Sequence, residues 1–216
     1  MKKICFVGAG RMTKEHLKVF SKIKNVKISG ITTRTIKKAK ILQKKYPELI
    51  IYKNLNQMLL DLKPDGVIVS VSENSLQRVC KILFKFKYPL LIEKPIGCNF
   101  KQNLNILNQL KKYKKKNCYV ALNRRFFNST LKLIEELKKD KGKRKIYIND
   151  QQYNLKSIYP HKEKIVRKNM MYANSVHLLD YVNILARGKI KSVKTNILKK
   201  KKSIFVNFKN KVYFWR

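Results

Sequence analysis

Three short segments hold the residues whose types and spacing could support chemistry. Gly8–Met12 follows the first apolar stretch, Lys94 ends a later one, and His177 lies in the segment 173–180. A glycine-rich turn can cradle phosphate, an ammonium group can stabilise negative charge on oxygen, and an imidazole can exchange a proton. Together they form the minimum set for binding a dinucleotide and moving a hydride and a proton.

The glycine segment has the spacing of a dinucleotide-binding turn. Gly8 would permit a tight turn, and Gly10 would let the backbone approach a pyrophosphate. A helix beginning near Arg11 and Met12 would add amide donors and a favourable dipole. Thr13 stands where the fingerprint has its third glycine, so a purely structural turn is the alternative. The position directly after an apolar strand and before a helix favours cofactor binding.

The end of the second predicted strand should indicate which dinucleotide is bound. A preference for NAD usually requires Asp or Glu there, about 20 residues after the glycines, to hold the ribose hydroxyls. This chain has Thr33 and Arg34, followed by Lys37 and Lys38. These groups can hold a 2′-phosphate, so we expect NADP(H) to be favoured over NAD(H). If the lysines only reflect general basicity, Thr33 and Arg34 are the informative residues.

Lys94 follows an apolar strand in the sequence Glu93-Lys94-Pro95. At the carboxyl edge of a parallel sheet, where doubly wound folds bind ligands, its ammonium group could favour charge developing on a substrate oxygen. The alternative is a solvated strand end in a lysine-rich protein. We also expect Ser70 and Glu93, which end the fourth and fifth strands, to line the cofactor site.

His177 lies on a predicted apolar helix, with Asp180 three residues further on. A lone histidine in such a place is more often a core residue than a catalyst. The chain has three histidines, however, so an acid–base role near neutral pH has few candidates. His16 is on the first predicted helix and His161 is in a polar loop. His177 is favoured only in combination with Lys94.

Short apolar runs alternate with amphipathic helices through the first half of the chain. This pattern predicts a doubly wound parallel sheet, a Rossmann domain over residues 1–121. Residues 122–216 change character and predict a short α+β domain with a small, mostly antiparallel sheet. The expected strands are 3–7, 26–32, 50–52, 66–71, 88–93, 118–122, 145–149, 190–198, 203–208 and 211–215. The expected helices are 13–21, 36–45, 55–62, 74–86, 100–116, 129–139 and 172–186.

The charge of the chain is unusual, with a formal net charge of +40 over 216 residues. The chain has 43 Lys and 9 Arg. A protein selected to read bases would use Arg, whose planar guanidinium makes bidentate contacts. We therefore expect no specific nucleic-acid partner, with a basic nucleic-acid-binding protein as a third-ranked alternative. The charge would still attract anionic ligands such as phosphorylated sugars and nucleotides.

Cysteine usage and hydropathy bear on location. The four cysteines lack Cys-x-x-Cys spacing and lie among apolar residues. This is typical of reduced, mostly buried thiols in a cytoplasmic protein. No apolar run approaches the roughly 20 residues that span a bilayer, so we expect no membrane association. No metal site is expected.

Together these residues resemble the Gfo/Idh/MocA family of NAD(P)-dependent oxidoreductases. The resemblance covers most of the chain and rests on Gly8–Met12, Asp65–Val69, Glu93–Gly97, Asn123–Phe126 and His177–Asp180. It implies that Lys94 lies between nicotinamide and substrate and that His177 donates or accepts the proton. Arg124 and Asn174 are expected to contact the substrate with them.

Three departures from the family pattern bear on the activity. Ala173 stands where the family commonly has an aspartate, four residues before the histidine. No histidine follows the fourth strand, in the segment Ser70–Leu76. The second domain is short for the family, whose larger sheet usually forms the subunit interface, so a homo-oligomer is in doubt.

The resemblance implies a sugar or nucleotide-sugar substrate, oxidised at a hydroxyl or reduced at a carbonyl. The form Ala-Asn-Ser-x-His is similar to that of members associated with bacterial surface-sugar synthesis. The alternative is a catalytically degenerate protein of the same fold that binds the cofactor or acts in regulation. Ala173 and the short second domain favour this alternative.

Overall fold

The computed structural model describes residues 1–142, 146–148, 175–186, 194–200 and 203–209. They fall into two compact units. The first contains residues 1–122 with 175–176, and the second contains the other described residues.

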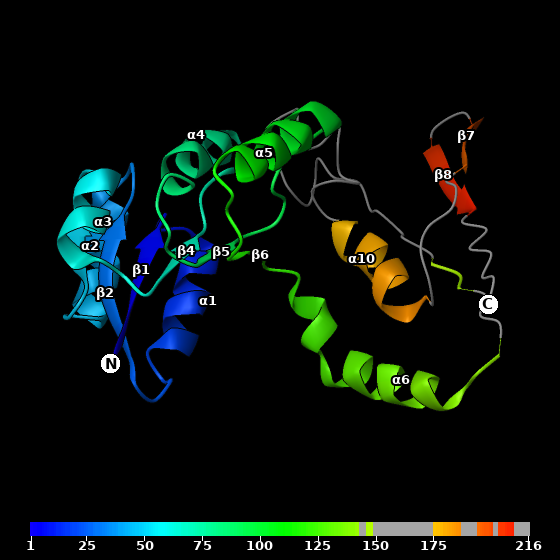
Figure 1. The fold of residues 1–216 in the computed structure, drawn as a ribbon, viewed down its shortest axis with the longest axis horizontal. Coiled ribbons are helices and arrows are strands. Elements are labelled where there is room, and N and C mark those ends of the chain that lie inside the picture. The colour runs from blue at the N-terminus through cyan, green and yellow to red at the C-terminus, as the bar shows by residue number, and fades with distance from the viewer. Residues whose placement is uncertain (143–145, 149–174, 187–193, 201–202, 210–216) are drawn as a thin grey trace. The chain divides into compact units, whose positions relative to one another are not determined.

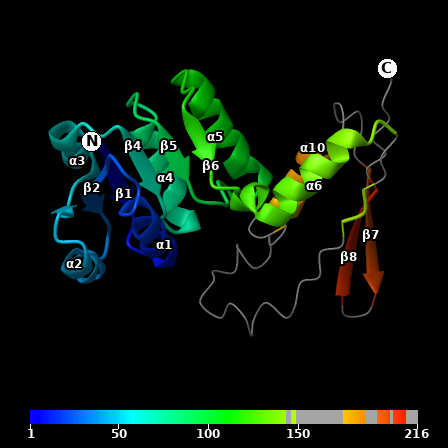
Figure 2. The same cartoon turned by 90° about the horizontal axis from the view of Figure 1, so that it is seen from below.

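The first unit is built on a parallel sheet of six strands in the order β3-β2-β1-β4-β5-β6 (Figures 1 and 2). The strand order reverses between β1 and β4, which is the switch point where open α/β sheets bind ligands. The strands are β1 (Lys2–Val7), β2 (Val26–Thr32), β3 (Ile50–Tyr52), β4 (Gly66–Val69), β5 (Leu90–Ile92) and β6 (Cys118–Val120). The helices are α1 (Arg11–Phe20), α2 (Ile36–Lys45), α3 (Leu55–Leu62), α4 (Glu73–Leu83) and α5 (Phe100–Lys112).

Two apolar clusters show that helices cover both faces of this sheet. Leu17 of α1 and Leu42 of α2 pack with Phe6 in one cluster. Met58 of α3, Leu76 of α4 and Ile106 of α5 pack in the other. Parallel strands buried on both faces carry continuous apolar runs, which is why short runs such as Gly66–Val69 were recognisable in the sequence. The expectation of a doubly wound Rossmann sheet is confirmed.

Most element boundaries lie within two residues of the expectations, and two of the differences are informative. The first helix begins at Arg11 rather than Thr13, so the glycine turn leads into it directly. The fifth helix ends at Lys112 rather than 116. Lys114 has φ +48° there, a left-handed conformation that an α-helix cannot continue through.

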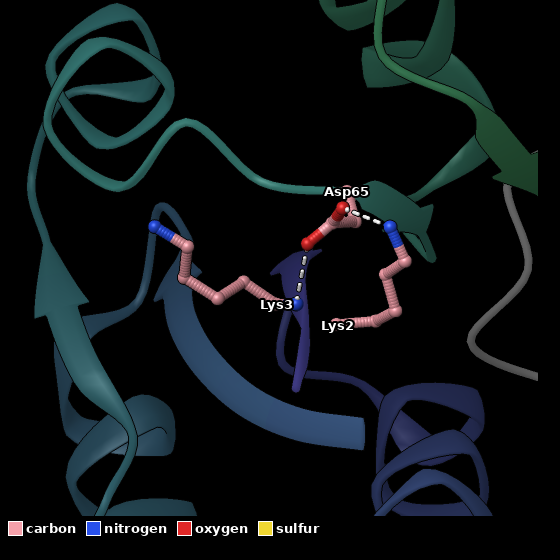
Figure 3. A network of polar contacts seen from close by, with 3 residues as sticks. All are labelled: Lys2, Lys3 and Asp65. Atoms are coloured by element: carbon pink, nitrogen blue, oxygen red, sulfur yellow. Dashed lines mark hydrogen bonds and ion pairs between the residues drawn. The ribbon is translucent and has the colours of Figure 1, made fainter. Parts of the chain in front are cut away.

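Asp65 ties the amino ends of β1 and β4 together (Figure 3). Its Oδ2 accepts a hydrogen bond from the Lys3 amide at 2.8 Å, and its Oδ1 accepts one from Lys2 Nζ at 3.0 Å. These contacts, the amide of Lys3 foremost, lower the pKa of the Asp65 carboxyl. Asp65 precedes β4, so it lies at the edge opposite the carboxyl ends and serves the fold.

The described part of the second unit holds a 3-10 turn, two helices and a hairpin. They are η1 (Asn123–Phe126), α6 (Asn128–Lys139), α10 (Val176–Leu185, whose first residue belongs to the first unit), β7 (Lys194–Lys200) and β8 (Ser203–Lys209). β7 and β8 pair antiparallel. Tyr181 of α10 joins Thr130 of α6 through their hydroxyls, 3.2 Å apart.

One expected strand of this unit is wrong within the described residues. Residues 146–148, inside the expected strand 145–149, have no regular structure. Tyr147 is 80% exposed there. An alternating pattern stabilises a strand only by packing against neighbours, so the pattern alone does not produce a strand. The expected strand 211–215 and the expected start of the helix at 172–174 lie outside the described residues.

Candidate functional site

The glycine turn after β1 lies at the switch point and is held by the neighbouring strands. Gly8 has φ +104°, a conformation that L side chains rarely adopt. A Cβ there would overlap the carbonyl oxygen of Ser70 and come within 2.8 Å of its carbonyl carbon. The amide of Gly8 donates to the carbonyl of Thr32 at 2.8 Å. Only glycine fits this position, where the backbone runs directly against the end of β4.

Gly10 has a different environment from Gly8. It caps the amino end of α1, is exposed, and would have nothing within 4 Å of an added Cβ. No side chain caps the helix here, and its first turn holds no acidic residue. The amides of Arg11 and Met12 therefore keep a positive helix end that no carboxylate of this turn neutralises. A small residue beside such an end leaves room for an anion.

Two buried hydroxyls near this turn have no hydrogen-bond partner among the described residues, Thr13 Oγ1 and Ser70 Oγ. Buried polar atoms are nearly always paired, so an orphaned hydroxyl beside a switch point is a candidate contact for a bound ligand. Thr13, at the third glycine position, is fully buried and so does not block the turn. The open Gly10 position and the Ser70 hydroxyl fit a bound dinucleotide phosphate.

Thr33 and Arg34 follow β2, on the other side of β1 from Ser70. Arg34 is exposed, and its guanidinium lies 3.4 Å from the hydroxyl of Ser72, which follows β4. The Thr33 hydroxyl accepts from the amide of Thr35 at 3.4 Å. Within residues 31–38 there is no carboxylate. The arrangement offers hydroxyl and guanidinium donors to an anion.

Lys94 follows β5 and is half-buried, and its peptide bond to Pro95 is cis. The loop after Pro95 is pinned to α5. The amide of Cys98 donates to Gln102 Oε1 at 2.7 Å, and Asn103 Nδ2 donates to the Gly97 carbonyl at 3.2 Å. The sequence Asn99-x-x-Gln102 is a capping-box pattern, which is the signal that could have located this anchor.

Glu93 is occupied by a partner that sequence reasoning did not identify. This partner is His16 of α1, whose Nε2 lies 2.7 Å from Oε1 of Glu93. His16 is one helical turn from the buried Thr13 and next to the buried Leu17, so it sits beside the core-facing stripe of α1. A polar residue beside such a stripe was the available signal, although nothing local named its partner.

In the second unit, His177 and Asp180 are both buried on α10. Asp180 forms a bidentate salt bridge with Arg125 of η1. This hydrogen-bonded partner raises the pKa of the Arg125 guanidinium. Arg124, the expected substrate ligand, is half-buried, and its carbonyl accepts from the Tyr181 hydroxyl at 3.4 Å. Sequence reasoning missed Arg125, because adjacent arginines give no local reason to choose one.

The expected site residues are therefore divided. Gly8, Arg34, Ser70 and Glu93 follow β1, β2, β4 and β5, at the carboxyl ends of these strands of the first unit, and Lys94 is the residue after Glu93. His177 belongs to the second unit, so its approach to Lys94 stays a prediction. Asn174 lies outside the described residues, as does Ala173.

The described residues contain neither a candidate metal cluster nor a candidate membrane-spanning helix. No group of three or more His, Cys, Asp or Glu side chains in that part of the chain could hold a metal ion. No helix formed by those residues is both long and apolar enough to cross a membrane.

Solved structures share the fold. A protein described as a myo-inositol dehydrogenase from Sinorhizobium meliloti matches with a TM-score of 0.69 and 15% identity. The match covers 91% of this chain and 59% of the Sinorhizobium chain. An NAD-binding protein from Listeria innocua matches with a TM-score of 0.67 and 22% identity. The match covers 91% of this chain and 58% of the Listeria chain. A myo-inositol dehydrogenase from Lactobacillus casei, in complex with NAD(H) and myo-inositol, matches with a TM-score of 0.60 and 18% identity. The match covers 64% of this chain and 42% of the Lactobacillus chain.

Across these three structures, the chain spans 42–59% of the matched protein's length. No curated protein sequence matches the chain. The family model of the Gfo/Idh/MocA oxidoreductases, with an NAD-binding Rossmann fold, matches residues 2–122, more than half of the chain. These residues are the six-stranded unit with the glycine turn and Lys94. The chain therefore belongs to the Gfo/Idh/MocA family of oxidoreductases.

Proposed function

We propose that this chain is an oxidoreductase that binds NADP(H) in preference to NAD(H) and acts on a hydroxyl or carbonyl group of a sugar or nucleotide sugar. The turn at the switch point carries the proposal. Gly8 packs against the Ser70 carbonyl while Gly10 opens the amino end of α1 to an anion. That division of roles is what a dinucleotide pyrophosphate needs.

Each residue of the site has one role in this proposal. The amides of Arg11 and Met12 hold the pyrophosphate, and Thr33 and Arg34 hold the 2′-phosphate. A bound nicotinamide supplies or accepts the hydride. Lys94 donates to the reacting substrate oxygen and stabilises negative charge on it. His177 exchanges the proton with that oxygen, and Arg124 and Asn174 hold the substrate.

The enzyme assignment is tested by turnover with NADPH or NADH over a panel of keto-sugars, and with NADP⁺ or NAD⁺ over a panel of polyols. Lys94→Ala and His177→Ala should each lower turnover by about 10²-fold or more, with NADPH affinity retained. Lys85→Ala, which removes an exposed lysine after α4, is the control and should change nothing. A folded wild-type chain that binds NADPH but turns over no substrate in the panel would favour the degenerate protein instead.

The cofactor assignment has its own test. Arg34→Ala should weaken NADPH binding by roughly 10- to 100-fold, because a charge-assisted contact to phosphate contributes about 1.5–3 kcal/mol. NADH binding should be unchanged, since NADH lacks the 2′-phosphate. Lys44→Ala, an exposed lysine in the last turn of α2 that is assigned to no site, is the matched control. Equal losses for the two cofactors would contradict the preference.

A further inference from the structure

We infer that His16 is a positioning residue for Lys94, because it holds Glu93 and thereby fixes the end of β5 against α1. His16 would touch neither substrate nor cofactor, and would act through the residue before Lys94. The inference rests on the proposed function, in which Lys94 acts on the substrate oxygen.

The contact itself is short and shielded. His16 Nε2 and Glu93 Oε1 are 2.7 Å apart, and the two side chains are 16% and 12% exposed. A carboxylate only accepts hydrogen bonds, so the ring Nε2–H is the donor. A charge-assisted hydrogen bond withdrawn from water is stronger and more geometrically restrictive than an exposed one.

Both ends of this contact are attached to the core. The His16 ring lies 6.4 Å from the Phe20 ring, and Phe20 packs edge-on to Phe6 of β1 at 6.3 Å. The amide of Glu93 donates to the carbonyl of Val69 at 2.8 Å. Leu91, two residues earlier, packs into the cluster beneath α1, so Glu93 continues the same side of the strand. The pair therefore joins two fixed supports rather than two mobile side chains.

The pair also connects the two halves of the proposed site. The helix that holds Glu93 is the one whose amino end follows Gly10. Lys94 is the next residue after Glu93, and the loop beyond it is pinned to α5 through Cys98. Lys94 is thus held from both sides along the chain. Because a displacement of about 1 Å in an active site can cost about 10²-fold in rate, loosening one anchor should reduce kcat.

The experiment combines a substitution series with a mutant cycle. His16→Leu should lower kcat about tenfold or more, with the Kd of NADPH changed less than about threefold, and His16→Gln, which keeps a donor, should restore most of kcat. In a Lys94→Ala background, His16→Leu should change kcat less than about twofold, because its effect passes through Lys94. Glu15→Gln, at an exposed carboxylate on the same helix, is the control.

A spectroscopic measurement tests the contact without turnover. In ¹H–¹⁵N spectra of the imidazole rings, Glu93→Gln should move the His16 signals and Glu15→Gln should not. If His16→Leu fails to fold, Glu93→Gln takes its place in the mutant cycle. Glutamine keeps the side-chain volume of glutamate and one hydrogen-bond acceptor.

The outcomes separate this inference from the proposed function. A wild-type chain without turnover over the panel overturns the proposed function and this inference with it. If the wild type is active but the losses from His16→Leu and Lys94→Ala multiply, the positioning role alone is overturned. Unchanged His16 signals in Glu93→Gln also overturn it.

Discussion

The two glycines of the turn after β1 should respond to the same substitution in opposite ways. Gly8→Ala should destabilise the fold. An alanine at φ +104° costs about 1–2 kcal/mol in backbone strain, and its Cβ would also overlap the Ser70 carbonyl. We expect a total of about 3 kcal/mol or more, and a Tm lower by about 6–12 °C at roughly 2–4 °C per kcal/mol.

Gly10→Ala should leave stability almost unchanged. Its φ of −86° suits alanine, and an added Cβ meets nothing within 4 Å. Alanine is a poorer helix cap than glycine, but it restricts the unfolded chain, so the net change should stay within about 1 kcal/mol. The substitution should instead weaken cofactor binding, because the new methyl group occupies the space left for pyrophosphate. We expect NADPH and NADH affinity to fall about tenfold or more, equivalent to about 1.4 kcal/mol.

Thermal unfolding and titration of nicotinamide fluorescence measure both effects on the same samples. If Gly10→Ala bound NADPH as tightly as wild type, the turn would not be a phosphate site. If Gly8→Ala were as stable as wild type, the close packing on Ser70 could not be the reason for glycine there.

Four further results are expected. Burial raises the pKa of Cys5 and of Cys80 to about 12, so both thiols should resist a thiol reagent in the native state. Because these pKa values are raised above the ordinary 9.0, their contribution to stability is complete below pH 9. This contribution should be lost as the pH rises from 9 toward 12. Denaturant unfolding at several pH values would measure the fall in the free energy of unfolding. Arg125→Ala leaves Asp180, whose side chain is 6% exposed, without its ion-pair partner. The free energy of unfolding measured in urea should fall by about 2–4 kcal/mol. A loss below about 0.5 kcal/mol would contradict a structural role for the pair. Duplex DNA should bind weakly, without sequence preference, and be released steeply by added salt. Sequence-selective nanomolar binding at physiological salt would overturn the expectation that the chain has no specific nucleic-acid partner.

The amino-acid sequence by itself determined the first unit closely. The order of strands and helices, the turn at Gly8 and Gly10, and the position of Lys94 after a buried strand were all predicted. Each depends on short-range physics: apolar periodicity selects helix or strand, and glycine selects the turn. Prediction failed at residues 146–148, where the described part of the chain shows no strand despite the alternating pattern.

Only the tertiary structure decided which polar side chains meet. His16 contacts Glu93 across 77 positions of the chain, and Arg125 contacts Asp180 across 55. The overlap that excludes a side chain at Gly8 comes from the carbonyl of Ser70, which follows β4. Local patterns contain no information about such partners, because the same lysine, histidine or arginine is equally compatible with solvent. Pairing depends on which strand ends and helix faces the folded sheet brings together, and that is a property of the whole unit.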